Sequence, residues 1–245
     1  MKFKYLTLTA AIFGSLTLVA CGAGDKKAGG ESANVIKIAT ASPLSGGQAT
    51  AGKDNESGAR LAVEEINAAG GVDIGGKKYT VELVSEDDAS DPKQGGTVAQ
   101  KIADDKSISA VVGHYNSGVT IVAQPIYAKA NLVAFTVSTN PDVINKAAKS
   151  DSGMTMIYRL DGSDAMQGPA LATFAQKKGL KNIAILDDAT AYGKGLADEV
   201  EKKAKSIGLT VIAHESATDK TTDFKAILTK LKSMGIDSIF WGGYD

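Results

Sequence analysis

Three short turns carry hydroxyl groups directly after apolar segments that have the composition of buried β-strands. They read Ser-Pro-Leu-Ser-Gly at 42–46, Gly-His-Tyr-Asn-Ser-Gly at 113–118 and Thr-Val-Ser-Thr-Asn-Pro at 136–141. A helix is expected after each turn, so free backbone N–H groups and a hydroxyl group converge where a carboxylate could be held. A single Ser or Thr is more often a plain helix cap, but three such turns at neighbouring strand ends favour a binding site.

Patterns that would indicate catalysis or a cofactor are missing from the sequence. His114 and His214 have no HExxH, Cys/His cluster or EF-hand spacing around them, and no P-loop, GxGxxG or GxSxG motif occurs. The pairs at 87–88 and 187–188, both Asp-Asp, could hold a metal at strand ends, but we expect them to cap turns or to be solvated. His214 is expected at the surface. We therefore predict no enzymatic activity, no cofactor and no metal site.

Short apolar runs alternate with amphipathic segments from Asn34 onward. Strands are predicted at residues 35–39, 81–84, 108–112, 132–135, 183–186, 211–213 and 239–241, and helices across 59–69, 196–207 and 224–234. Gly70-Gly71 is predicted to end the first helix, and Asp91-Pro92 to begin another. This alternation predicts an α/β fold with parallel sheets and right-handed crossovers. We expect two lobes, at residues 34–157 and 158–245. We also expect the second lobe to be incomplete, as in a fragment of a longer protein.

Cys21 is the single cysteine and follows Leu-Val-Ala at 18–20. Lys2 and Lys4 precede an uncharged apolar run, which is the layout of a signal peptide, and small residues before the cysteine match a bacterial lipobox. We predict a lipoprotein signal peptide at 1–20, lipidation of Cys21, and a flexible tether at 21–33. An ordinary signal peptide with a free thiol, or a membrane anchor, is the less favoured interpretation. The near-balance of 27 basic and 28 acidic residues argues against nucleic acid as a partner.

Nine short motifs in a fixed order resemble the leucine/isoleucine/valine-binding proteins of bacterial ABC transporters, which are type I periplasmic binding proteins. The similarity runs from about Ile36 to the last residue. The motifs include Pro-Leu-Ser-Gly at 43–46, Asp-Asp-Ala-Ser-Asp-Pro at 87–92, Gln-Gly-Pro at 167–169 and Tyr-Gly-Lys-Gly-Leu-Ala at 192–197. The resemblance implies two Rossmann-like lobes that close on an amino acid by hinge motion.

The resemblance also implies roles for individual residues of the first lobe. Ser117 would bind the ligand carboxylate through its hydroxyl group, and the main chain of Tyr115 and Asn116 would line the same place. Thr139 would contact the carboxylate or the ammonium group, assisted by main chain near Ser138.

Tyr192 and Tyr244 are implied to come from the second lobe and to close over the ligand. Two positions differ from the branched-chain receptors: Ala51 replaces a tyrosine and Tyr115 replaces a smaller aliphatic residue. The acidic residue that pairs the ligand ammonium in the family falls beyond the last residue of this sequence.

The function that the resemblance implies is amino-acid capture for an ABC importer. We expect a lipid-anchored, monomeric receptor in the periplasm or cell envelope that binds a branched-chain or other aliphatic amino acid and presents it to the membrane permease. The alternative is a ligand-sensing receptor of the same fold, for amides, urea or other amino acids. An enzyme on a doubly wound sheet is the third possibility.

Overall fold

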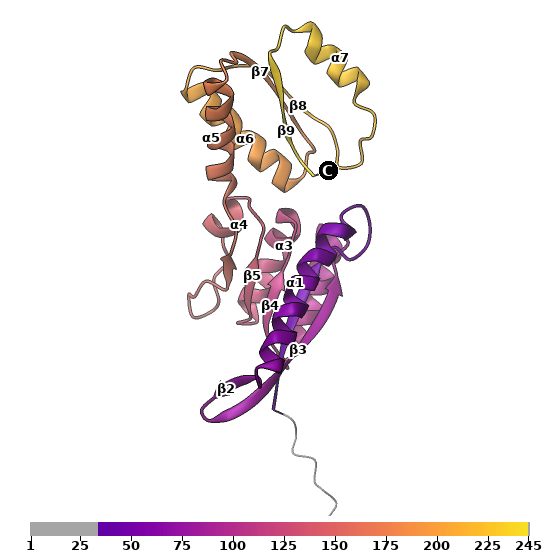
Figure 1. Cartoon of the computed structure of the whole chain (residues 1–245), viewed down its shortest axis with the longest axis vertical. Coiled ribbons are helices and arrows are strands. Elements are labelled where there is room, and N and C mark those ends of the chain that lie inside the picture. Colours follow the sequence, from indigo (N-terminus) through magenta and orange to yellow (C-terminus); the bar gives the residue numbers. More distant parts are fainter. Residues whose placement is uncertain (1–33, 245) are drawn as a thin grey trace, which may run out of the picture. The chain divides into compact units, whose positions relative to one another are not determined.

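Strands and helices alternate through residues 34–244, the part of the chain that the computed structural model describes (Figure 1). The α/β class predicted from the sequence is confirmed. The predicted signal peptide at 1–20, the tether at 21–33 and the lipidation site Cys21 lie outside the described residues. Within residues 34–244, no helix is both long and apolar enough to cross a membrane.

The first sheet has six strands in the order β2-β3-β1-β4-β5-β6. Their bounds are β1 Val35–Ser42, β2 Val72–Ile74, β3 Lys77–Asp87, β4 Ile108–Gly113, β5 Val133–Thr136 and β6 Ile157–Arg159. All neighbours pair in parallel except β2, which forms an antiparallel hairpin with β3 through Gly75-Gly76. Both glycines have positive φ angles, 60° and 79°, which explains why this turn uses glycine.

The strand order reverses direction at β1. The chain moves from β1 to β3, returns to β4 on the other side of β1, and continues to β5. With right-handed crossovers, helix α1 (Ala49–Ala68) covers one face of the sheet, while α2 (Pro92–Asp104) and α3 (Ser117–Lys129) cover the other. Ligands of such sheets bind beyond the carboxyl ends of the strands at the point of reversal, which here lies between β1 and β4.

Apolar side chains of α2, α3 and the central strands form the first core. Its fully buried members include Ile102, Val111, Ala123 and Tyr127. Helix α2 begins as predicted, because the Asp91 side chain accepts a hydrogen bond from the backbone N–H of Gln94 and Pro92 occupies the first turn.

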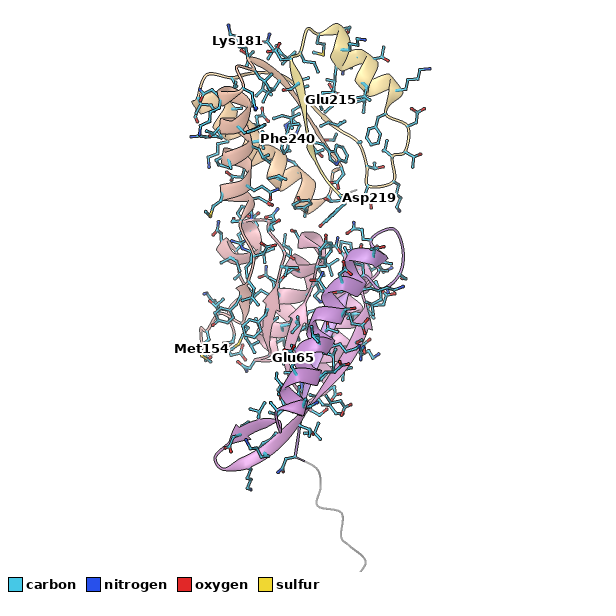
Figure 2. The ribbon with its side chains drawn as sticks, viewed as in Figure 1. Glu65, Met154, Lys181, Glu215, Asp219 and Phe240 are labelled. Carbon is cyan, nitrogen blue, oxygen red and sulfur yellow. The ribbon has the colours of Figure 1, made fainter. Side chains whose placement is uncertain are left out.

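Helix α1 departs from the burial expected of its apolar residues. Of the face predicted for 59–69, Ala62, Ile66 and Ala69 are exposed and Ala59 and Val63 are only partly buried. The only fully buried residue of α1 is Gly52, near its N-terminal end. Glu65, labelled in Figure 2, belongs to this exposed part of the helix. The helix packs on β1 and β3. Most of its length therefore contributes little to the core.

The second sheet has three parallel strands in the order β8-β7-β9. Their bounds are β7 Asn182–Asp187, β8 Thr210–Ser216 and β9 Ser238–Gly242, and the helices are α5 Asp164–Lys177, α6 Ala191–Ser206 and α7 Lys225–Ser233. Helices α5 and α6 pack side by side, and α7 lies on the other side of the strands (Figure 1). Ile185, Val200 and Leu209 are buried in this second core, and Phe240 packs against it (Figure 2).

Strand β6 crosses the predicted border between residues 157 and 158, and it pairs with β5 in the first sheet. The polar stretch 140–153 contains a single helical turn, α4 (Asp142–Asn145). The division at 157/158 remains a prediction.

Candidate functional site

Five of the seven residues predicted to bind ligand line one cavity of about 270 Å³. The complete lining is Tyr115, Ser117, Val137, Thr139, Asp161, Gln167, Tyr192, Gly243 and Tyr244. The first-sheet contribution comes from the turns after β4 and β5, two of the three turns that the sequence analysis singled out. The third turn, at 42–46, contributes no residue to the lining. The side chains of Asn116 and Ser138 do not line this cavity.

Ser117 stands at the first position of α3, where the helix offers unbonded N–H groups. The N-cap residue Asn116 makes no side-chain cap hydrogen bond, and its Nδ2 instead donates to Gln48 Oε1 at 2.7 Å. The Ser117 hydroxyl is buried and accepts a weak hydrogen bond, 3.4 Å long, from the backbone N–H of Asn140. A helix N-terminus without a side-chain cap attracts an anion, because its N–H groups carry partial positive charge.

Ser138 does not line the cavity, and its side chain instead binds the backbone of the turn after β4. Its Oγ lies 2.5 Å from Thr120 Oγ1 and donates to the carbonyl oxygens of His114 (3.1 Å) and Tyr115 (3.0 Å). Thr136 also donates to the His114 carbonyl, at 2.7 Å. These buried hydroxyl groups fix the backbone that leads into Ser117, which is consistent with the main-chain role expected near Ser138.

Three buried side chains in contact with one another also fix the turn after β4. Asp88 Oδ2 lies 2.7 Å from His114 Nδ1, and His114 Nε2 lies 2.9 Å from the Tyr127 hydroxyl. All three side chains are essentially inaccessible to solvent, and burial raises the pKa of Tyr127. A His-Asp pair without solvent access has no substrate to act on, so we interpret it as part of the frame of the site.

Tyr192 and Tyr244, which belong to elements of the second sheet, line the cavity. The ring centroid of Tyr244 lies 4.8 Å from that of Tyr192 and 6.1 Å from that of Tyr115. Burial raises the pKa of Tyr244, while hydrogen bonding to the Asn116 side chain and the Ser117 backbone opposes the rise. The phenol of Tyr244 therefore reaches the N-terminus of α3, and aromatic surface faces the hydroxyl groups of the first sheet.

Three residues at the site were not predicted from the sequence. Asp161 and Gln167 line the cavity, and Asp164 lies next to its wall. Asp164 is the first residue of α5, and its backbone N–H donates to the Thr139 carbonyl at 3.0 Å. An acid in the first turn of a helix is ordinary, so its residue type gave no signal. Gln167 belongs to the Gln-Gly-Pro motif, but the sequence analysis gave it no role in binding.

The two aspartate pairs cap turns, as expected, although they are buried or partly buried. Asp87 Oδ1 accepts from the N–H groups of Leu44 and Ala89, both at 2.8 Å. In the second pair, Asp187 Oδ1 accepts from the Ala189 N–H at 2.7 Å, and Asp188 caps the next turn in the same way.

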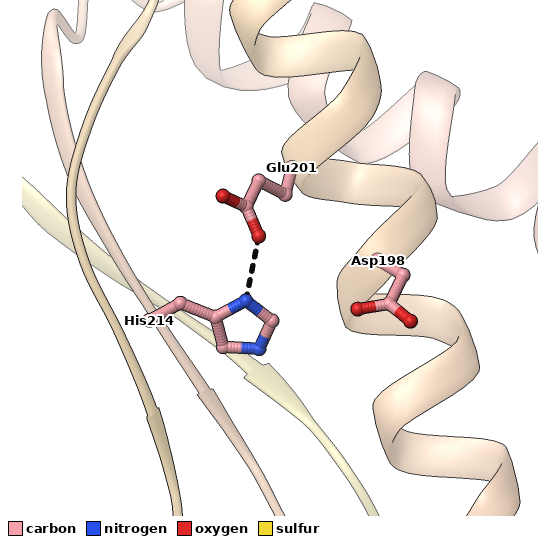
Figure 3. Close-up of side chains that lie close together, drawn as sticks. All are labelled: Asp198, Glu201 and His214. Carbon is pink, nitrogen blue, oxygen red and sulfur yellow. Dashed lines mark hydrogen bonds and ion pairs between the residues drawn. The ribbon is translucent and has the colours of Figure 1, made fainter.

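The expectation that His214 is a surface residue is wrong. Only 20% of its side chain is exposed, and its two ring nitrogens lie 2.7 Å from Glu201 Oε2 and 2.9 Å from Asp187 Oδ2. Figure 3 shows the contact with Glu201 and places Asp198 on the same helix. These three side chains could hold a metal by position. However, Lys205 already pairs with Glu201 and Lys194 with Asp198, so the group is better explained as a polar link between α6 and the sheet.

A larger cavity of about 850 Å³ lies beneath α7 and β9. Its lining is rich in apolar side chains, including Phe224, Leu228, Ile239 and Trp241. The helix N-terminus that borders it, at α2, is already capped by the side chain of Asp91. The smaller cavity combines an uncapped helix N-terminus with convergent hydroxyl groups, and is therefore the candidate ligand site.

Comparison with known sequences finds a family model, described as periplasmic binding protein, that matches residues 35–244. The chain is 39% identical over 214 residues to the leucine-, isoleucine-, valine-, threonine-, and alanine-binding protein of Pseudomonas aeruginosa, covering 86% of this chain and 54% of that protein. It is 36% identical over 218 residues to Leu/Ile/Val-binding protein homolog 1 of Brucella abortus, covering 88% and 56%. The chain thus spans about half the length of these relatives.

Solved structures give the same result. The branched-chain amino acid transporter substrate binding protein LivJ of Streptococcus pneumoniae, in complex with isoleucine, matches with a TM-score of 0.73 at 30% identity, covering 85% of this chain and 57% of that one. A solute binding protein of Rhodopseudomonas palustris in complex with p-hydroxybenzoic acid matches with a TM-score of 0.73 at 22% identity. At that identity the second match supports the fold alone.

Proposed function

Because the chain belongs to the periplasmic binding protein family, as its resemblance to the leucine/isoleucine/valine-binding proteins predicted, we propose that it binds an aliphatic amino acid in the 270 Å³ cavity. One observation carries this proposal. The uncapped N-terminus of α3, with the Ser117 hydroxyl at its first residue, opens into a cavity whose opposite wall is aromatic.

The polar side of the cavity suits the α-carboxylate. Backbone N–H groups of α3 and the hydroxyl groups of Ser117 and Thr139 provide donors on elements that are held in place by packing. Donors fixed before binding cost little conformational entropy when the carboxylate arrives. Tyr192 and Tyr244 provide the apolar surface against which an aliphatic side chain can pack.

The two lobes would close on the ligand because its binding partners come from both of them. The donors belong to turns of the first sheet, and both tyrosines belong to elements of the second. A ligand that contacts both sets favours the closed arrangement, because each ligand shifts a conformational equilibrium by its difference in affinity for the two states. No bond is made or broken in this function.

The wider role that we propose is delivery to an ABC permease. Family membership supports a place outside the cytoplasmic membrane, and the leader pattern with Cys21 supports a lipid anchor followed by a tether at 21–33. The ligand-binding lobes would be residues 34–157 and 158–245, acting as a monomer that meets the permease when closed on ligand.

Calorimetric titration of the purified protein with L-leucine, L-isoleucine and L-valine tests the binding proposal. Replacing Ser117 by alanine should weaken amino-acid binding by about 1–3 kcal/mol, because a buried charged group loses a hydrogen-bond partner. Ser107→Ala, at an exposed turn before β4, is the matched control and should change nothing.

Equal affinity of the wild-type protein and Ser117→Ala would overturn the carboxylate site. A thermal-shift screen extends the test to amides and urea, since a tight ligand raises the melting temperature by mass action. Stabilisation by amides or urea, and by no amino acid, would instead support the sensing receptor that is the alternative function.

A further inference from the structure

Asn140 joins the two sides of the ligand cavity without lining it. Its Nδ2 donates a hydrogen bond of 2.6 Å to the carbonyl oxygen of Ala191, the first residue of α6. Thr139, which lines the cavity, directly precedes Asn140. Tyr192, which also lines it, directly follows Ala191. The hydrogen bond therefore links the hydroxyl side of the cavity to its aromatic side, one residue away from each.

The first-sheet end of this hydrogen bond is held in place by three neighbours. Asn140 is buried, and its Oδ1 accepts from the Asp142 N–H at 2.8 Å. Its backbone carbonyl accepts from Arg159 Nη1 at 3.2 Å, and its backbone N–H donates weakly to the Ser117 hydroxyl at 3.4 Å. Both ends of the carboxamide are thus bonded, so the side chain cannot turn without losing a hydrogen bond.

The second-sheet end of the hydrogen bond leads to both tyrosines of the cavity. The Thr190 hydroxyl caps α6 by accepting from the Gly193 N–H at 3.0 Å, and it donates to Asp188 Oδ1 at 2.6 Å. The other oxygen of Asp188 accepts from the Tyr244 N–H at 3.0 Å. Tyr192 lies in the first turn of α6, and Tyr244 is bound to the same carboxylate as the helix cap. Fixing the start of α6 therefore fixes both rings.

Small residues allow the elements of the two sheets to approach closely at this point. Helices α3 and α6 contact each other, and a Cβ at Gly118 of α3 would lie 3.6 Å from the Cβ of Ala191. A Cβ at Gly195, one turn after Ala191, would lie only 2.3 Å from Asn140 Nδ2. Glycine at position 195 therefore leaves the space that the Asn140 carboxamide occupies.

We propose that Asn140 is a positioning residue for ligand binding, whose carboxamide holds Tyr192 and Tyr244 against the hydroxyl groups of the first sheet. This proposal rests on the proposed function and adds to it the contact that sets the two sides of the cavity relative to each other. Capping the turn after β5 requires only Oδ1, so the bond from Nδ2 to Ala191 is a second task of the same side chain. An aromatic wall that is in place before the ligand arrives needs less ordering on binding.

The test is a double-mutant cycle on the affinity for L-leucine, measured by calorimetry for the wild-type protein, Asn140→Ala, Tyr192→Ala and the double variant. Residues that act through one another give non-additive losses, whereas independent residues give additive ones. Gly195→Ala disrupts the same hydrogen bond from the side of α6, because its Cβ displaces the carboxamide while Asn140 itself is kept. Asn145→Ala, at an exposed position of α4, and Gly58→Ala, which meets no atom within 4 Å, are the matched controls.

We expect Asn140→Ala and Gly195→Ala each to weaken L-leucine binding by about 3- to 10-fold, the loss typical of one neutral hydrogen bond. Both control variants should stay within about 2-fold of the wild-type protein. In the Tyr192→Ala background, Asn140→Ala should weaken binding by less than about 2-fold, because the ring that it positions is already absent.

Three results would overturn the inference and leave the proposed function standing. Asn140→Ala could leave the affinity unchanged, or it could weaken binding equally with and without the Tyr192 ring. A loss from Asn140→Ala without one from Gly195→Ala would assign the effect to the cap of α4 instead of the bond to Ala191. Failure of the wild-type protein to bind L-leucine would overturn the proposed function itself.

Discussion

The cost of burying Asp164 can be measured without any ligand. Asp164→Asn replaces the carboxyl group by a neutral group of the same shape. In the folded protein its pKa is raised from 3.8 to about 6, mainly by burial. The folded state therefore holds this proton more tightly than the unfolded state, and ionisation destabilises folding by about 1.4 kcal/mol for each pH unit of the difference, or about 3 kcal/mol in total.

The sign of the pH dependence follows from the raised pKa. The folded-state advantage of the protonated carboxyl is fully present below pH 3.8 and is lost as the pH rises through about 6. Asparagine never ionises. Asp164→Asn should therefore be more stable than the wild-type protein by up to about 3 kcal/mol at pH 7.5, and by about half as much at pH 5.

Thermal denaturation followed by circular dichroism gives the assay. For a chain of this size, about 2–4 °C of melting temperature corresponds to each kcal/mol, so the gain at pH 7.5 should be up to roughly 6–12 °C. Asp161→Asn, at the exposed carboxylate, should stay within about 1–2 °C of the wild-type protein at both pH values. A variant that is less stable than wild type, or a gain that does not shrink between pH 7.5 and pH 5, would refute the claim that burial raises the pKa of the Asp164 carboxyl group.

Four further substitutions test the packing of α1 and the aromatic face of the site. Gly52→Ala should lower stability by about 1–3 kcal/mol, because a Cβ there would overlap the Pro43 carbonyl oxygen. Gly58→Ala on the same helix meets no atom within 4 Å and should raise stability by about 0.5–1 kcal/mol in urea unfolding; equal effects would contradict the packing of α1. Tyr244→Phe keeps the ring contact with Tyr192 and should weaken leucine binding by about 1 kcal/mol, while Tyr244→Ala should weaken it more. Calorimetry giving the two substitutions equal effects would argue against an aromatic wall.

Buried strands were predictable because several of them are nearly continuous apolar runs. Segments such as 183–186 and 108–112 have no other plausible environment than a sheet covered on both faces. Strand β2 was missed because it has only three residues, Val-Asp-Ile, which are too few to establish a periodicity and are largely exposed. The opposite error occurred in α1, where helical spacing was correct but the apolar face is half exposed. The periodicity of apolar residues predicts a helix, but the burial of its apolar face depends on which elements pack beside it.

Hydroxyl groups at strand ends were predictable because parallel strands bring their carboxyl ends together. Ser117 and Thr139 line one cavity for that reason. The burial of Asp164 was not predictable, since an acid in the first turn of a helix is usually exposed and only the three-dimensional arrangement shows that this one is not. His214 was misjudged because polar neighbours along its strand suggest exposure, whereas Glu201 of α6 and Asp187 of β7 contact its ring and partly bury it.

A crystal structure of the protein grown with L-leucine would test the central claim most directly. We predict density for the ligand in the 270 Å³ cavity, with its carboxylate at the N-terminus of α3 beside the hydroxyl groups of Ser117 and Thr139. Leucine bound instead against Trp241 in the larger cavity, or with its carboxylate turned away from α3, would contradict the proposed site.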